Sequence, residues 1–567
     1  MRRGWAEVDF PCGVVLATAL LTLLLLTGEA VLGARGIGLS QDEPVQVLRF
    51  EQWLRDGWYV QPYLVAGGGP DAGTPSSPFV YAPVFSALGH LVNTALGNEG
   101  LGEISSMAEA YETRHLVVAM TGLAAVFCVG AAVRVLTRDR LAAIWSAAAL
   151  LAIPVWTGNS MFNVKDIPVA SGFTFVTVGL VVGLAGARRD AWPPWRLLAA
   201  GALVALGTLI GVGTRPAMWV PFVCSLSAYA ALSWLMLRST GRLLRSVVVP
   251  AVGLLVGLVG VAEVYPNAAA TPIDWLIGSV SDSSGFVHHT ETLTAGELLS
   301  STDAPVWYLP AWIFAGVPVI VFGLAALGIV VVIGNALRRR SRERGADAPS
   351  HAQAGGMLLV VLQLVLLPTA AIVAGSSIYN ALTQHLYVLP AVAILAGNGA
   401  AKVLAGARSR EASRRVGWAA ALVLALALAV PAVEQTRLYP YNYVYVNPIA
   451  GLGGVQDRWE TEFQFISSRE AFRRLPSSVE PACSDWLVPE IGPTPRPIIE
   501  GCREYPPFRD EVGDEATASA TRGETWVVGR TRAGNHPPDH CREHDNVTRT
   551  LRTEEIVMAY VLRCTPP

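Results

Sequence analysis

Several charged side chains stand beside apolar stretches of the chain, where a charge is costly to keep. Asp42 and Glu43 follow the first apolar stretch. Lys165 and Asp166 lie in Asn-Val-Lys-Asp-Ile-Pro, and Arg215 lies in Gly-Thr-Arg-Pro, between two apolar stretches. A carboxylate here could accept a proton from a hydroxyl group, while lysine and arginine could hold a phosphate. The plainer alternatives are a solvated acidic pair, an ion pair in a turn, and an arginine that reaches the lipid headgroups.

The composition of the chain makes the membrane its solvent. Of 567 residues, 52% are hydrophobic and only 15% are charged, which is too apolar for a soluble globular protein. The formal net charge of -2 gives no basic excess, so nucleic acid is not expected as a partner. We therefore expect an all-α polytopic domain that is embedded in a lipid bilayer.

About eleven segments approach the roughly 20 apolar residues that a helix needs to cross the hydrocarbon core. They are Phe10–Gly33, Leu116–Val133, Leu141–Thr157, Ile167–Ala187, Leu197–Gly213, Pro216–Leu237, Ser246–Val261, Tyr308–Leu337, Met357–Ala374, Leu386–Ala400 and Val416–Val433. The first could be a signal peptide, but its length and the many segments that come after it favour a transmembrane helix.

The distribution of lysine and arginine predicts the orientation of the chain, because cytoplasmic loops are enriched in both. With a cytoplasmic N-terminus, the cytoplasmic side contains Arg2 and Arg3, Arg134–Arg140, Arg188 and Arg189, Arg238–Arg245, Arg338–Arg344 and Lys402–Arg415. The loop 265–307 on the opposite side contains neither lysine nor arginine. An odd number of spans then places the C-terminal part outside the cytoplasm, so we expect a multi-pass plasma membrane protein.

We divide the chain into two domains. Residues 1–433 are expected to form the transmembrane domain, and residues 434–567 a C-terminal extracytoplasmic domain. The transmembrane domain includes two long outside loops, 34–113 and 265–307. The amphipathic stretch Phe79–Leu96 is short and contains a proline, so we expect it to lie along the membrane interface rather than cross the bilayer.

The C-terminal domain combines strand-like runs with cysteines. The runs Thr525–Gly529 and Ile556–Leu562 predict a small α/β fold. Four of the seven cysteines are in this domain: Cys483, Cys502, Cys541 and Cys564. Four cysteines allow three pairings, and we favour disulfides between sequence neighbours, the first with the second and the third with the fourth. The alternative is a zinc site made of His536, His540, Cys541 and His544, although their spacing fits no compact four-ligand pattern.

Short motifs along the chain carry a family resemblance. In order, they are Asp42-Glu43, Tyr111–Leu116, Asn163–Pro168, Gly213–Arg215, Pro305–Pro310, Gln384–Pro390 and Tyr441–Pro448. No single motif is decisive, but their order, from Asp42 to Ala471, resembles the GT-C superfamily of membrane glycosyltransferases. The similarity is to the branch that contains the protein O-mannosyltransferases and the aminoarabinose transferase of lipid A.

The resemblance implies a GT-C fold and an inverting transferase whose donor is a sugar linked to polyprenyl phosphate. The acceptor would be an envelope glycan, a glycolipid or an exported protein on the extracytoplasmic face. Asp42 would be the catalytic base, with Glu43 beside it. The donor phosphate would bind to side chains that are expected at the same face: Lys165, Arg215, Arg114 and His385.

Residues 80–85 depart from the pattern of the family. In relatives this interfacial stretch has an acidic or basic residue next to its proline, and that residue helps to bind metal or phosphate. Here the stretch is Val-Tyr-Ala-Pro-Val-Phe, without a charge. The metal site of the family is therefore not expected to carry over unchanged. If a divalent metal is bound, Asp166 and Glu112 are its candidate ligands. The other alternative is that these carboxylates serve as a second acid or as contacts to the donor.

A tyrosine-rich segment comes after the last predicted span. Tyr439, Tyr441, Tyr443 and Tyr445 alternate with other residues as in a strand. Such tyrosines either anchor the chain at the membrane interface or form a wall on which a sugar stacks.

A transporter or lipid flippase is the main alternative function. Such proteins often have internal repeats and ionisable groups near the middle of their spans. No repeat is evident here, and the interiors of the apolar segments are almost free of charge. A receptor or assembly scaffold is a third alternative, which the large C-terminal domain allows.

Overall fold

The computed structural model describes most of the chain. The described residues are 10–40, 43–57, 79, 81–105, 107–186, 194–237, 240–287, 289–341, 351–409, 413–476, 480–481, 487–488, 492–493, 515–519, 525–531 and 541–564. Asp42, Cys483, Cys502, His536 and His540 lie outside these residues, so what the sequence predicts for them stays a prediction.

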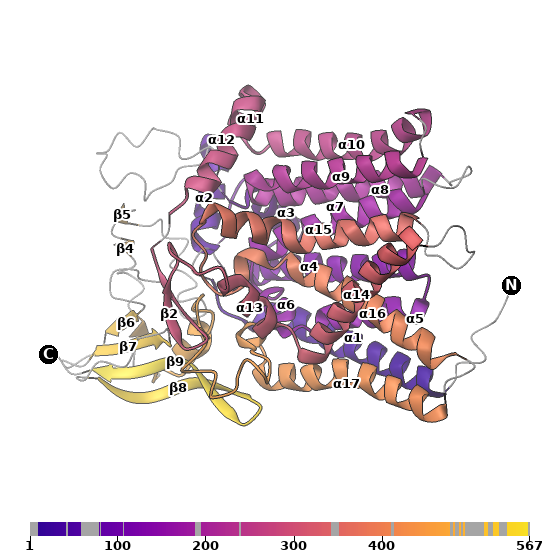
Figure 1. Ribbon diagram of the computed structural model, residues 1–567. Helices are drawn as coiled ribbons and strands as arrows, with labels where there is room; N and C mark the ends of the chain where they lie inside the picture. The colour runs from indigo at the N-terminus through magenta and orange to yellow at the C-terminus, as the bar shows by residue number, and fades with distance from the viewer. Residues whose placement is uncertain are drawn as a thin grey trace.

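A bundle of long apolar helices forms the body of the molecule (Figure 1). Within the described residues, eight helices are long and apolar enough to cross a membrane. They are α1 (Phe10–Gly36), α4 (Ala108–Thr137), α7 (Asp166–Gly186), α8 (Pro194–Thr214), α9 (Trp219–Leu237), α15 (His351–Ala374), α16 (Val388–Ala407) and α17 (Arg414–Leu438). A ninth span is the bent pair α13 (Tyr308–Gly316) and α14 (Val319–Ser341). The last two predicted segments are shorter apolar helices: α5 (Arg140–Leu151), and Ser246–Ala262 within α10 (Thr240–Ala262).

Two segments that the hydropathy predicts as single spans are each broken in two. In Leu141–Thr157, α5 is followed by the separate helix α6 (Pro154–Asn159). In Tyr308–Leu337, α13 and α14 meet at an angle of 115°. The residues before the prolines, Ile153 and Val317, have extended backbones. Proline disfavours helical geometry in the residue that precedes it, which explains both breaks.

Asn447 donates hydrogen bonds to the backbone carbonyl groups at the second break. Its side-chain Nδ2 donates to the carbonyls of Phe314 at 2.5 Å and Val317 at 3.2 Å. Its backbone N–H donates to the carbonyl of Ala315 at 2.8 Å. Unpaired backbone groups within a bilayer cost several kcal/mol, so these bonds allow a helix to bend there.

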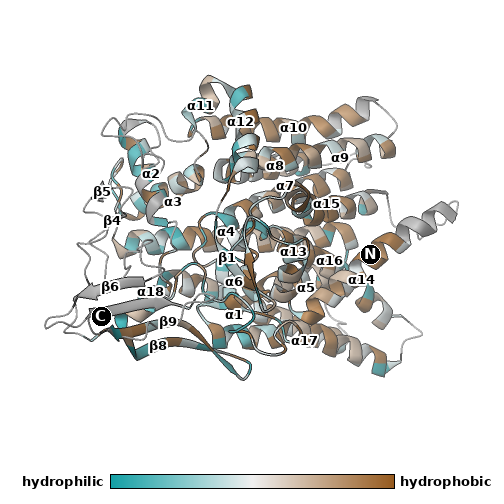
Figure 2. Cartoon of the chain, turned by 60° about the vertical axis from the view of Figure 1, so that its left-hand side comes forward, coloured by the Kyte–Doolittle hydropathy of each residue, from teal (hydrophilic) through white to brown (hydrophobic). Residues whose placement is uncertain are grey.

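The polar elements gather at one end of the bundle, and α1 begins at the other end (Figure 1). The helices at the polar end are α2 (Glu43–Asp56), α3 (Pro83–Leu96), α11 (Pro266–Ala270) and α12 (Pro272–Gly285). Figure 2 shows more hydrophilic residues there, whereas the long helices are mostly hydrophobic. The two long loops and the C-terminal sheet therefore share one end of the bundle.

The loop 265–307 is folded rather than irregular. After α11 and α12 it forms an antiparallel hairpin of β1 (Glu291–Thr294) and β2 (Glu297–Ser300). The hairpin is joined to the C-terminal part of the chain at Glu460. The Glu460 backbone N–H donates to the carbonyl of Leu293 at 2.9 Å, and its carboxylate accepts from the Leu293 N–H at 3.3 Å. Residues far apart in the sequence thus form one surface.

The C-terminal domain contains a five-stranded antiparallel sheet in the order β3-β6-β7-β9-β8. Its strands are β3 (Glu480–Pro481), β6 (Glu515–Ser519), β7 (Thr525–Arg530), β8 (Cys541–Leu551) and β9 (Glu554–Cys564). A further pair, β4 (Leu487–Val488) and β5 (Gly492–Pro493), stands apart from this sheet, and α18 (Ser468–Arg473) precedes both. The predicted strands Thr525–Gly529 and Ile556–Leu562 are found as β7 and β9.

The cysteines of the sheet lie at the open end of the β8 and β9 hairpin. Cys541 is disulfide-bonded. Cys541 and Cys564 are directly opposite each other in the strand register. Cross-strand neighbours are close enough for a disulfide. The pairing of these two cysteines stays a prediction, as does that of Cys483 with Cys502.

The tyrosine-rich segment is not a strand. Residues Asn442–Val444 form a turn of 3-10 helix, η4. Tyr441, Tyr443 and Tyr445 are buried instead of lining an open wall. Tyr441 donates to Glu470 at 3.0 Å, and Tyr443 donates to Glu462 at 2.6 Å. The alternation in the sequence is misleading here because these tyrosines satisfy buried carboxylates of the same chain.

Helix α7 is the most buried span, and glycines allow α8 to approach it closely. A Cβ atom on Gly207 would stand 2.5 Å from the carbonyl oxygen of Gly172, and one on Gly172 would stand 2.8 Å from the backbone of Gly207 and Gly211. Small residues at helix contacts are typical of membrane proteins, because close backbone approach replaces the hydrophobic driving force.

We predict that Gly207→Ala destabilises the bundle by about 1–3 kcal/mol, because the added methyl overpacks the contact of α7 with α8. The measurement is the apparent melting temperature of the purified protein in detergent. The matched control is Gly323→Ala in α14, where an added Cβ meets no atom within 4 Å. Equal melting temperatures for the two variants would contradict the prediction.

Candidate functional site

An ion pair joins the start of α7 to the end of α8 at the polar end of the bundle. Nη2 of Arg215 donates to Oδ1 of Asp166 at 2.5 Å. Asn163 holds the carboxylate in place, since its Nδ2 donates to Oδ2 of Asp166 at 3.0 Å and its Oδ1 accepts from the Asp166 backbone N–H at 2.8 Å. A carboxylate at a helix N-terminus is also favoured by the helix dipole. The motif Asn-Val-Lys-Asp therefore forms the turn that begins α7.

Two cations share the ring of Tyr81. The guanidinium carbon of Arg215 is 5.7 Å from the ring centre, and Nζ of Lys165 is 5.9 Å from it. Both distances are within the range of cation–π attraction. The position of Tyr81 is fixed by its neighbour, because the Ala82 N–H donates to the carbonyl of Thr214 at 2.9 Å. The uncharged stretch at residues 80–85 thus contributes an aromatic ring that contacts two cations.

His385 is the fourth predicted phosphate ligand, and it is neutral. It belongs to the 3-10 turn η3 (Thr383–His385), where burial and the nearby Arg215 charge lower its pKa to about 3. Its Nδ1 is buried without a hydrogen-bond partner among the described residues. Its ring centre is 5.6 Å from that of Tyr387. A neutral imidazole can still donate one hydrogen bond.

We call Tyr81, Lys165, Asp166, Arg215 and His385 the Arg215 cluster. The cluster contains two cations, Lys165 and Arg215, and one carboxylate, Asp166. The Asp166 side chain is almost fully buried, whereas 24% of the Arg215 side chain is exposed. The Nε of Arg215 also has no hydrogen-bond acceptor within the described part of the chain. The cluster therefore has both the charge and the spare donors to bind an anion such as a phosphate.

Glu43 is buried where α1 leaves the bundle, and its carboxylate is occupied by protein groups. Oε1 lies 2.8 Å from Nε2 of His115 on α4. Oε2 accepts from the backbone N–H of Ser40 at 3.0 Å and from its hydroxyl at 3.3 Å. Nδ1 of His115 lies 3.2 Å from the carbonyl oxygen of Ala34. Glu43 therefore links Ser40, at the end of the segment after α1, to His115 on α4. These contacts favour a structural role for Glu43.

Arg114 and Glu112 lie on the same helix as His115 but have other partners. Arg114 pairs with Glu99 and donates to the carbonyl of Ser105 at 2.9 Å. Glu99 also lies 2.7 Å from Nδ1 of His90. These contacts give Arg114 a structural partner in the loop that precedes α4. The sequence does not predict that Glu99 and Ser105 are the partners of Arg114, because no motif marks these two residues.

Glu112 points to the C-terminal part of the chain. Nη2 of Arg469 on α18 donates to Oε1 of Glu112 at 3.0 Å. Arg469 also donates to the carbonyls of Arg35 at 2.8 Å and Ile37 at 3.1 Å. Three residues of one helical turn, Glu112, Arg114 and His115, thus hold three different segments against α4.

The candidate metal ligands are not brought together. Asp166 pairs with Arg215, and Glu112 pairs with Arg469. Among the residues that the structure describes, no three His, Cys, Asp or Glu side chains converge as a metal site would require. A divalent metal stays a prediction.

Comparisons with known proteins give structural matches only. No protein-family model matches the chain, and no curated protein matches it. The apo structure of ArnT from Cupriavidus metallidurans is similar with a TM-score of 0.47 and 15% identity, over 86% of this chain and 85% of that one. The same protein bound to undecaprenyl phosphate gives a TM-score of 0.48, with the same identity and coverage.

An oligosaccharyltransferase from Archaeoglobus fulgidus is similar with a TM-score of 0.43 and 15% identity, over 87% of this chain and 60% of that one. With 15% identity and TM-scores of 0.48 and less, the likeness says nothing of substrates. The chemistry of this chain must therefore be inferred from its own residues.

We predict that His385 makes the stability of the protein depend on pH. Its folded pKa of about 3 is below its ordinary value of 6.5, so between these values the unfolded chain binds a proton that the folded chain does not. Stability contributed by His385 is complete above pH 6.5 and is lost progressively as the pH decreases from 6.5 toward about 3.

The measurement compares melting temperatures of the protein and of His385→Gln from mildly acidic to neutral pH. The glutamine variant keeps a neutral polar group and should lose the dependence below pH 6.5. His544→Gln, at an exposed position on β8, is the control and should behave as the unaltered protein. Parallel curves for the protein and His385→Gln would contradict the prediction.

Proposed function

We propose that this chain is a membrane glycosyltransferase that moves a sugar from a polyprenyl-phosphate donor to an acceptor on the extracytoplasmic face of the plasma membrane. The observation that supports it best is the Arg215 cluster, in which two cations share one tyrosine ring and one of them, Arg215, pairs with the Asp166 carboxylate. The acceptor is a hydroxyl group of an envelope glycan, a glycolipid or an exported protein.

The position of the cluster favours a phosphate that is attached to a lipid. Arg215 stands between α8 and α9, which are both apolar enough to cross the bilayer, so the cluster lies at the membrane boundary. A lipid phosphate reaches this depth without leaving the bilayer. Arg215 supplies a planar pair of donors for it, and Lys165 supplies a point charge.

Asp166 and His385 have supporting roles in this proposal. Asp166 fixes the direction of the Arg215 guanidinium through their 2.5 Å contact. His385 is neutral, because burial and Arg215 lower its pKa to about 3. It can donate a hydrogen bond to a phosphate oxygen without adding a positive charge that would bind the product too tightly.

The transfer step is a displacement at the anomeric carbon. The oxygen of the acceptor hydroxyl attacks this carbon, and the bond from the carbon to the phosphate oxygen breaks. The hydroxyl proton passes to the Asp42 carboxylate, which we propose as the base, and the bonding electron pair leaves on the phosphate. Lys165 and Arg215 stabilise the charge that develops there. The products are the inverted glycoside and free polyprenyl phosphate.

The first test of the proposal is binding of undecaprenyl phosphate to protein in lipid nanodiscs. Removing Arg215 alone would leave Asp166 buried and unpaired, so the variant combines Asp166→Asn with Arg215→Gln, which keeps a neutral hydrogen bond. We expect at least about a tenfold loss of affinity, as for one hydrogen bond to a charged group.

The control for this double variant is a second ion pair at the other end of the bundle. Arg408 donates to Asp139 at 2.5 Å, so Asp139→Asn with Arg408→Gln makes the same chemical change there. This control should bind undecaprenyl phosphate as the unaltered protein does. If both double variants bind equally, or if the unaltered protein does not bind the lipid, the Arg215 cluster is not a phosphate site.

The second test addresses Asp42. Asp42→Asn should lower the rate of sugar transfer by roughly 10²- to 10⁴-fold, the usual contribution of a general base, and should leave the affinity for undecaprenyl phosphate unchanged. The readout is acceptor-dependent release of polyprenyl phosphate in membranes. Unchanged activity would remove Asp42 as the base. Lipid movement across vesicles without such release would favour a flippase instead.

A further inference from the structure

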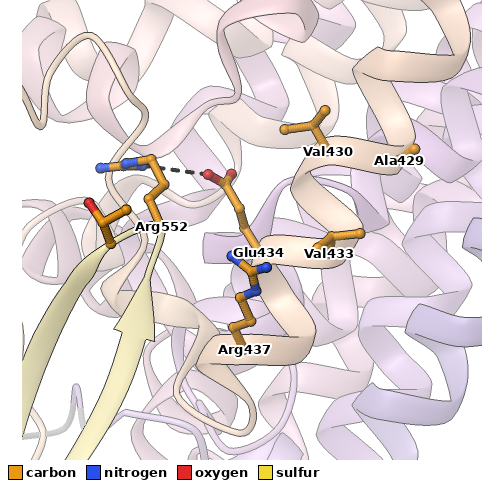
Figure 3. Close-up of a pocket in the computed structure, with 7 residues that line it drawn as sticks. Ala429, Val430, Val433, Glu434, Arg437 and Arg552 are labelled. Carbon is orange, nitrogen blue, oxygen red and sulfur yellow. Dashed lines mark ion pairs between the residues drawn. The ribbon is translucent and has the colours of Figure 1, made fainter.

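A cleft separates the sheet from the outer end of α17. It has a volume of about 470 Å³. The residues that line it include Val430, Val433, Glu434 and Arg437 from α17, and Arg552 from the turn between β8 and β9. Figure 3 shows Arg552 reaching toward Glu434, with the two valines on the helix beside them. This cleft is distinct from the Arg215 cluster.

One wall of the cleft continues an apolar stripe on α17. Leu422, Leu426, Val430 and Val433 are all exposed and repeat at intervals of four, four and three residues, so they share one helix face. Because α17 is apolar enough to span the bilayer, this face contacts lipid chains. The cleft therefore opens onto the bilayer rather than only onto water.

Two arginines stand where this stripe ends. Arg437 comes four residues after Val433 and is exposed at the end of α17. Arg552 is held from the other side, since its Nη1 donates to the carbonyl of Val446 at 2.9 Å and lies 3.6 Å from Oε1 of Glu434. With one carboxylate against two guanidinium groups, the end of the cleft has an excess of positive charge.

The backbone of Arg552 indicates that its side chain is needed. Its φ angle is 58°, in the left-handed region, within a two-residue hairpin turn. Glycine or asparagine fits such a turn at less cost than arginine. An arginine at this position is explained by the contacts that its side chain makes in the cleft.

We propose that this cleft binds a membrane phospholipid with an anionic headgroup. Its acyl chain lies along Val430 and Val433, and its phosphate lies between Arg437 and Arg552. A soluble anion would satisfy only the arginines, whereas a phospholipid satisfies both the apolar wall and the charged end. The bound lipid joins the hairpin of the sheet to the bilayer surface.

The test uses the full chain in nanodiscs that contain phosphatidylcholine and phosphatidylglycerol, with native mass spectrometry of the lipids that stay bound. Phosphatidylglycerol should be retained in preference. Arg437→Ala and Arg552→Asn should each lower this preference by about fivefold, the usual effect of one basic side chain near an anionic surface. Asparagine at 552 fits the turn, so a loss there reports the guanidinium and not misfolding.

Two further variants distinguish a lipid held in the cleft from a soluble anion or a general attraction to the anionic surface. Arg542→Ala removes an exposed arginine from the far end of the same hairpin and should change nothing. Val433→Trp fills the apolar part of the cleft and should lower retention of both lipids. The proposal fails if Arg542→Ala acts like Arg437→Ala, if Val433→Trp has no effect, or if added glycerol phosphate displaces the retained lipid.

Discussion

The contact between Asp166 and Arg215 is the constraint on which the polar end of the bundle depends. Both side chains stand at the ends of apolar helices, where an unpaired charge would cost several kcal/mol. Pairing them fixes the start of α7 against the end of α8, and the adjacent Thr214 carbonyl fixes the start of α3. The cations that give this region its chemistry are therefore positioned by the same contacts that close the bundle.

The packing of the spans and the bend in one of them result from the absence of water in the bilayer. Glycines let α7 and α8 approach each other until backbone meets backbone. At the bend between α13 and α14, Asn447 binds the carbonyls that the break would otherwise leave unpaired. The close glycine contact and the Asn447 hydrogen bonds both replace interactions that water would provide in a soluble protein.

Hydropathy was enough to locate the helices, because each span must be long and apolar. It could not locate the breaks before Pro154 and Pro318, since the hydropathy of an apolar run is the same whether the run is straight or bent. Orientation predicts that Lys165, Asp166, Arg215 and His385 lie at one face. It does not predict which of them gather, since Arg114 was expected with them and pairs with Glu99 instead. The contribution of Tyr81 could not be predicted, because aromatic residues are common near membranes. Partners such as Arg469 for Glu112, 357 positions apart, depend on tertiary packing that no local pattern records.

The N-terminal part of α4 restricts the movement of the segments packed against it. Glu112, Arg114 and His115 hold the C-terminal segment, the preceding loop and the exit of α1. Movement of any one of these three segments would have to move α4 with it or separate one of these contacts. The three segments should thus move together with α4 as one rigid unit, and larger motions at this end of the bundle must come from segments that these side chains do not hold.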